Sequence, residues 1–135
     1  MSLTGDLVTY ILADSDVTDL IGQKLFDLYV PEDTTYPYCT LVRESMTIED
    51  DLTGKTSLRQ SMYSFMIDGE TSIQCEAVEE AIITLLGSIR GTIGTSNVRV
   101  IYYQGSNDTF IPPVDGSEES THLIEMNFEV HWFST

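Results

Sequence analysis

Basic residues are scarce in this chain, which has six Lys and Arg against 22 Asp and Glu and a formal net charge of −16. A surface that holds a phosphate backbone must be basic, because its binding is driven by counterion release. The composition therefore excludes ordinary nucleic-acid binding and disfavours anionic membranes. The acidity is explained most simply by solubility or by a salt-adapted host, and the alternative is a negative surface that repels passing DNA.

Long apolar runs are also missing, and the longest fall far short of the roughly 20 residues that cross a bilayer. Residues 1–6 lack the basic start and apolar stretch of a signal peptide. Apolar residues nevertheless make up 41% and aromatics 10% of the chain, which is too much for a disordered segment. We therefore expect one soluble, cytosolic domain over residues 1–135.

Cysteine is limited to Cys39 and Cys75, with no CxxC and no metal-ligand spacing. Cys39 lies in a strand-like run and Cys75 in a helix-like one. Free cysteine commonly acts as a small core residue, and a disulfide is disfavoured in a reducing compartment. We expect both thiols to be free and buried.

Helical periodicity predicts an amphipathic helix over residues 3–14 and a stronger one that begins at a cap on Thr71 or Ser72. A short turn follows the first helix, capped by Ser15 or Asp16 and ended by Gly22. Strands are expected where β-branched and aromatic residues gather or alternate with polar ones. These segments are 24–30, 38–44, 58–67, 97–103 and 124–132.

Two polar segments, 46–57 and 105–121, are expected to be loops. The predicted fold is α+β, a mainly antiparallel five-stranded sheet packed against two helices in the order α-β-β-β-α-β-β. Its core is predicted from the apolar stripes of the helices and the apolar faces of the strands. The residues are Leu7, Ile11, Tyr63, Phe65, Ile82, Leu86, Phe128, Val130 and Trp132.

Gly54-Lys55-Thr56 matches the end of a phosphate-binding GxxxxGK[ST] loop, but Glu49 stands where the first glycine is required. A strand rather than a helix is expected to follow. We interpret the segment as a hairpin turn and not as a nucleotide site.

The two histidines, His122 and His131, are nine residues apart in the last strand and must point to opposite faces. They cannot share a metal within one subunit. We expect His131 to be solvated and His122 to lie at the rim of the apolar face. No GxSxG motif accompanies them.

Acidic clusters could in principle hold a hard cation, but neither has the one-three-five oxygen spacing of a calcium loop. We interpret both as solvated loops. The residues are Asp50 and Asp51 in one and Asp108, Asp115, Glu118 and Glu119 in the other. With no catalytic, cofactor or metal site predicted, the sequence favours a structural or binding role.

Several segments, in order along almost the whole chain, resemble the tail-completion proteins of long-tailed bacteriophages, also called tail terminators or head–tail joining proteins. The likeness lies in residues 7–14, Val17, 20–22, Phe26, 36–38, 61–65, Ala77, Ala81, 91–94, 98–100 and 128–132. No single motif among them is diagnostic. The segments 46–57 and 105–121 are longer and more acidic than in the family's plainer members.

The resemblance implies a non-catalytic virion protein, assembled in the host cytoplasm and placed at the head–tail junction. Six copies would form a ring that caps the tail tube, stops its polymerisation and joins the tail to the head connector, with DNA passing through unbound. The acidic cluster Glu49, Asp50 and Asp51 is the candidate for the channel wall. Alternatives are a tail-tube or head-closure subunit, or a small cytosolic enzyme or ligand-binding domain.

Overall fold

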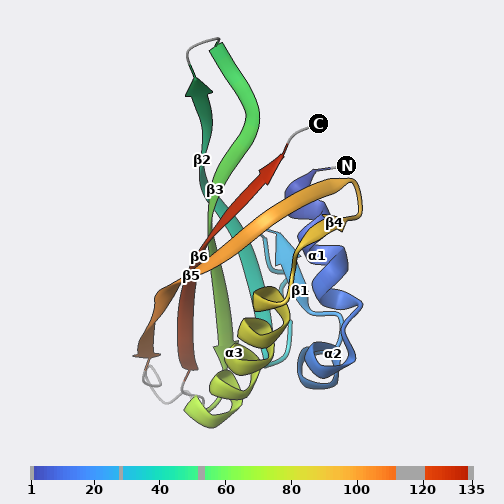
Figure 1. Cartoon of the computed structure of the whole chain (residues 1–135). Helices are drawn as coiled ribbons and strands as arrows, with labels where there is room; N and C mark the ends of the chain where they lie inside the picture. The colour runs from blue at the N-terminus through green and yellow to red at the C-terminus, as the bar shows by residue number, and fades with distance from the viewer. Residues whose placement is uncertain (1, 28, 52–53, 112–120, 134–135) are drawn as a thin grey trace.

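The computed structural model describes residues 2–27, 29–51, 54–111 and 121–133, which form three helices and six strands (Figure 1). The helices are α1 (Leu3–Leu12), α2 (Ser15–Ile21) and α3 (Ser72–Gly87). The strands are β1 (Leu25–Asp27), β2 (Tyr38–Asp51), β3 (Gly54–Gly69), β4 (Gly91–Ile93), β5 (Ser96–Ile111) and β6 (Thr121–Phe133). The α+β class is as predicted.

All six strands belong to one sheet in the order β1-β2-β3-β6-β5-β4. Every pairing is antiparallel except that of β1 with β2, which is parallel. The two central strands are paired along most of their length, from Leu58 opposite Phe133 to Gly69 opposite His122. The far end of the β2–β3 hairpin projects well beyond the helices, at the top of Figure 1.

The helices cover one face of the sheet (Figure 1). α3 packs on β3, β5 and β6, whereas α1 packs beside β1, β2 and β4. On that face Tyr63, Phe65 and Ile67 of β3 are fully buried, which confirms the predicted inward direction of this alternation. The even-numbered residues from Ile124 to Val130 of β6 are buried in the same way.

The predicted core is confirmed for eight of its nine residues, which are all buried. Tyr63 and Phe128 stack at its centre with their ring centroids 6.0 Å apart. Trp132 is only partly buried, and its indole N–H donates to the Ser61 hydroxyl over 3.0 Å. Trp132 therefore closes the end of the core instead of filling it.

Each helix begins at a side-chain cap. The Ser2 hydroxyl accepts from the Gly5 amide, the Asp14 carboxylate from Val17 and the Thr71 hydroxyl from Gln74. Thr71 is one of the two predicted caps of α3. Residues 15–21 are a real helix rather than a turn, and its cap is Asp14 instead of Ser15 or Asp16, although Gly22 ends it as expected.

The sheet differs from the prediction in having six strands rather than five, and three helices stand where two were expected. β4 is only three residues long, too short for a pattern to reveal, and β1 stops at Asp27 instead of residue 30. The expected loops are wrong in large part, because β2 runs on to Asp51, β3 starts at Gly54 and β5 reaches Ile111. In the described side chains of these extensions, residues 46–49 and 106–110, none is buried, so they lack the alternation that marks a half-buried strand.

Candidate functional site

The acidic candidates Glu49, Asp50 and Asp51 lie at the end of β2, on the projecting hairpin rather than in a loop. Asp50 is paired with Lys55 and Asp51 with Gly54 across the hairpin. The strand pairing therefore presents these three acids at one end of the molecule. Their orientation toward a channel stays a prediction.

The phosphate-loop fragment Gly54-Lys55-Thr56 is the start of β3, which continues as a strand to Gly69. A phosphate-binding loop requires a helix at this point, since the helix N-terminus supplies the amides that hold the phosphate. The expectation that a strand follows is confirmed, and the fragment has no nucleotide-binding geometry.

The two histidines occupy separate environments. The ring of His122 lies 4.0 Å from the Asp108 carboxylate, and its Nε2 atom has no hydrogen-bond partner within the described residues. The expectation that His131 is solvated is wrong: its Nε2 contacts the Glu129 carboxylate, and its ring lies nearly perpendicular to that of Tyr102, with the ring centroids 5.2 Å apart. Neither histidine has a nucleophile or a second ligand beside it among these contacts.

Cys39 and Cys75 are free and buried, as predicted. Burial raises the pKa of both thiols, that of Cys75 to about 11, with a further contribution from the nearby Asp68 carboxylate. The Cys75 thiol donates to the backbone carbonyl of His122 over 3.3 Å. Protonated, buried thiols are poor nucleophiles, so both cysteines act as small core residues.

No group of three or more His, Cys, Asp and Glu within the described parts of the chain could hold a metal ion. Asp108 lies in β5, whereas Asp115, Glu118 and Glu119 fall outside the described residues. None of the described helices is both long and apolar enough to cross a membrane.

A hollow of about 380 Å³ lies between α2 and α3 and is open to solvent. Its charged lining consists of Asp14, Asp16 and Glu80 with no base, so it would repel an anionic ligand. A second hollow of about 80 Å³ lies between α3 and the β5–β6 pair and is almost wholly apolar, lined by Leu86, Ile101 and Tyr103 among others. Both lack the convergent polar groups that orient a small substrate.

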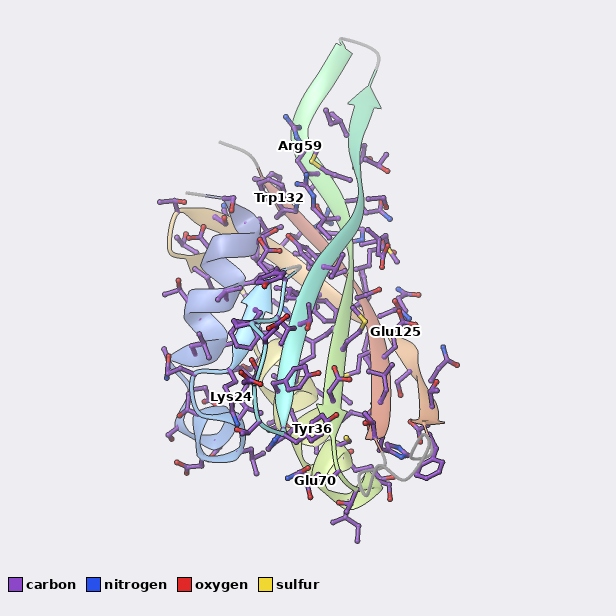
Figure 2. The ribbon with its side chains drawn as sticks, turned by 180° about the vertical axis from the view of Figure 1, so that it is seen from behind. Lys24, Tyr36, Arg59, Glu70, Glu125 and Trp132 are labelled. Atoms are coloured by element: carbon purple, nitrogen blue, oxygen red, sulfur yellow. The ribbon has the colours of Figure 1, made fainter. Side chains whose placement is uncertain are left out.

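The sheet face away from the helices carries polar side chains that form hydrogen bonds with one another. Figure 2 shows the molecule from behind, with Glu125 on this face. The Ser64 hydroxyl lies 2.7 Å from a Glu44 carboxylate oxygen and 2.9 Å from the Asn127 side-chain oxygen. Further along, Gln60 donates to Glu129 over 2.5 Å. These cross-strand bonds link β2, β3 and β6 and hold the uncovered face in a fixed arrangement.

A buried carboxylate joins α1 to the β4–β5 turn. Asp6 is only 2% exposed, and its Oδ2 accepts from the Thr95 amide at 3.2 Å, the Thr95 hydroxyl at 3.0 Å and the Ser96 hydroxyl at 2.5 Å. Burial by itself raises the pKa of this carboxyl, but the hydrogen bonds from Ser96 and Thr95 outweigh burial and hold the pKa below its ordinary value of 3.8. Asp6 therefore stays ionised inside the fold.

Gly94 makes this approach possible, because it has a φ of +56° and a Cβ there would lie 2.2 Å from Asp6 Oδ1. The contact between Asp6 and the turn at Gly94 was not predicted from the sequence. An acid in the first turn of a helix is usually exposed, and its partners are about 90 residues away in the chain. The only signal was Gly94 followed directly by two hydroxyl residues.

Both edges of the sheet are open over long stretches, a feature that the loop predictions concealed. β1 pairs only with Cys39–Leu41 of β2, and β4 pairs only with Ser96–Val98 of β5. In the described residues, no other strand pairs with the outer edge of β2 from Val42 onward or of β5 from Arg99 onward. Such edges present unpaired backbone N–H and C=O groups that another strand can bind.

The fold has a close match among solved structures. The chain aligns with a chain of the virion of a native gene transfer agent (GTA) particle with a TM-score of 0.73 and 14% identity, over 98% of each chain. A second solved structure aligns with a TM-score of 0.44 and 14% identity, over 97% of this chain and 92% of the other, a score too low to indicate a common fold. No protein-family model and no curated protein matches the sequence.

Proposed function

We propose that this chain is a structural subunit of a phage-like virion, and more specifically a ring-forming tail terminator. The observation that carries the proposal is the whole-length match of its fold to a virion chain of a gene transfer agent particle, 98% of both chains. The sequence resemblance to tail-completion proteins points the same way and supplies the narrower role. In that role six copies cap the tail tube, stop its growth and join it to the head connector, without catalysis, cofactor or membrane.

The arrangement of the described residues supports a building block rather than an enzyme. The buried cysteines, the separated histidines and the acid-lined hollow offer no nucleophile with a neighbouring base and no anion site. What the structure does offer is two open sheet edges and a hairpin that projects from the body. Surfaces of this kind serve contact between proteins.

The charge supports a passive channel for DNA. Six copies of a chain with a net charge of −16 would carry −96 in one ring. Acids of this density oppose contact with like-charged neighbours, so most of them must face solvent or the channel. We assign Glu49, Asp50 and Asp51, at the hairpin end, to the channel wall, where they would repel phosphate and leave DNA free to move.

Native mass spectrometry, with and without purified tail tubes, tests the proposal. A terminator gives a closed ring of six and electron micrographs with the ring on one end of each tube. A tail-tube subunit would instead polymerise into tubes by itself, and a ligand-binding domain would stay monomeric with a small molecule bound. A monomer in both conditions overturns the proposal.

A ring reconstruction tests the channel assignment separately. The hairpin end should lie at the inner wall, and a ring with Glu49, Asp50 and Asp51 on its outer rim refutes the assignment. As a functional check, the triple variant Glu49→Gln, Asp50→Asn, Asp51→Asn should slow DNA passage. The control is Glu76→Gln, Glu79→Gln, Glu80→Gln in α3, which removes the same charge from another surface and should leave passage unchanged.

A further inference from the structure

The two open edges belong to opposite sides of one sheet. Within the described residues, no strand pairs with the outer side of β5 from Val100 to Gly105 or of β2 from Val42 to Thr47. The two stretches lie at the same level of the sheet, because Val42 is level with Gly105 and Thr47 is level with Val100. Next to these stretches, β1 covers the outer side of β2 and β4 covers that of β5. Open edges are commonly blunted by charge, proline, lysine or a bulge. Both stretches lack proline and lysine and carry no net charge, and each contains one register shift. Two different edges that meet between copies form a heterologous contact, the type that closes rings.

Side chains on β5 also favour a covered edge. Tyr102 and Tyr103 are 51% and 45% exposed, so two adjacent aromatic side chains of this edge are open to solvent. On β2 the large apolar Met46 is exposed as well, at 39%. A neighbouring strand would remove apolar surface from water at both edges.

Charge identifies which surface a second copy can approach. Residues 100–105 contain no acid or base, and residues 42–47 contain one base, Arg43, and one acid, Glu44, so both stretches are neutral in a chain that carries −16 overall. A second copy can therefore approach these two edges without the repulsion that the acidic surface exerts elsewhere.

Strand direction follows from the symmetry of a ring. Within one copy the order β2-β3-β6-β5 is antiparallel throughout, so β2 and β5 run in opposite directions. A rotation about a ring axis that lies along the strands leaves those directions unchanged. The β5 of one copy therefore meets the β2 of the next in an antiparallel pair, and the alternation of the sheet continues across the contact.

We propose that copies of this chain join by strand pairing, with the β5 edge (residues 100–105) of one copy bound to the β2 edge (residues 42–47) of the next. This inference rests on the proposed ring and names the surface that builds it. The partner is a second copy of the chain. Backbone hydrogen bonds supply the contact, and the apolar side chains of both edges are covered by it.

The register follows from the pairings across one copy. Thr47 is opposite Gln60, Gln60 opposite His131 and His131 opposite Val100, so Thr47 and Val100 lie at one level on the same face of the sheet. Without an offset between copies, Thr47 of one copy faces Val100 of the next. An offset of a few residues would move this partner to Tyr102 or Gln104.

Disulfide trapping tests the contact. Thr47→Cys is combined in turn with Val100→Cys, Tyr102→Cys or Gln104→Cys, under mild oxidation. Within one copy the two sites are three strand spacings apart, about 14 Å, which is too far for a disulfide. Any bond therefore joins two copies, and a ladder of covalent species up to six is expected for at least one pair.

The matched control is Thr47→Cys with Glu125→Cys, whose second cysteine lies on the same face but on the central strand β6. It should give no ladder, and one as strong as that of the edge pairs overturns the inference. Native mass spectrometry of each variant measures the ring independently. Rings without any edge-specific ladder overturn strand pairing and leave the terminator standing, whereas the absence of rings with and without tail tubes overturns both.

Discussion

The buried carboxylate of Asp6 gives the sharpest test of how this fold is held. We consider the change Asp6→Asn, which keeps the shape of the side chain and removes its charge. The single oxygen Oδ2 accepts three hydrogen bonds from Thr95 and Ser96. Hydrogen bonds to a charged group contribute about 1.5–3 kcal/mol each, but they are not additive, and Asn can keep part of the set. We expect a loss of about 2 kcal/mol in the free energy of unfolding at neutral pH.

The sign of the pH dependence follows from the lowered pKa of Asp6. The native state favours the ionised form, so the stabilisation is complete above the ordinary pKa of 3.8 and is lost as the pH falls through the native pKa below it. The difference between the natural chain and Asp6→Asn should therefore shrink in acid. Urea unfolding at neutral pH and below pH 3.8 measures it.

Asp19→Asn is the matched control, because Asp19 is exposed in α2 and its loss should change stability by less than about 0.5 kcal/mol. An Asp6→Asn penalty as small as that of the control would refute the anchoring role. A penalty that is the same in acid and at neutral pH would show that the charge contributes nothing.

Three further changes test other parts of the reasoning. Gly94→Ala should lower the melting temperature more than Gly91→Ala. Both glycines have a positive φ, but of the two only Gly94 has another atom, from Asp6, within 4 Å of the position that a Cβ would take. Equal decreases would show that the clash with Asp6 does not affect stability. Phe128→Ala should lower the free energy of unfolding by about 3–5 kcal/mol, enough to endanger folding, whereas Ile73→Ala, at a residue 79% exposed, should change it by less than about 0.5 kcal/mol. An unchanged melting temperature for Phe128→Ala would show that this face of β6 does not point into the core. Ring assembly should strengthen as salt rises, because the Debye length falls from about 10 Å at 0.1 M to about 3 Å at 1 M and screens repulsion between copies; sedimentation that shows weaker assembly in salt would contradict this.

The parts of the fold that touch the core were accessible from the sequence. The stripe on α3, the alternation on β6 and the aromatic face of β3 each have one side to bury, and burial is what imposes a period on the chain. α2 was recognised as a feature but not as a helix, because seven residues give less than two full repeats of a helical period. Its cap is Asp14, which precedes the predicted Ser15 or Asp16.

The parts that the sequence did not reveal share a different cause. Residues 46–51, 54–57 and 105–111 are strands, yet no helix covers them, and their hydrogen bonds depend on a neighbouring strand rather than on a buried side-chain pattern. The Asp6 cluster depends likewise on a contact between the two ends of a long stretch of chain. The hydrophobic pattern of a single sequence indicates which side chains are buried, but it does not indicate which distant strands pair. Polar segments were therefore interpreted as loops although they are solvent-exposed strands.

The same physics connects these missed strands to assembly. A two-stranded ribbon without a core beneath it is marginal in water, because its backbone bonds compete with solvent and little apolar surface is buried. Here β2 and β3 continue beyond the helices to Asp51 and Gly54, and β5 continues beyond its short pairing with β4 to Ile111. Strands extended in this way gain their missing stabilisation when another strand pairs with the open edge. Under the proposed strand pairing, residues predicted to be in loops, among them Met46 and Thr47, lie at the contact, and the uncharged edge of β5 is where a strongly acidic chain can accept a second copy.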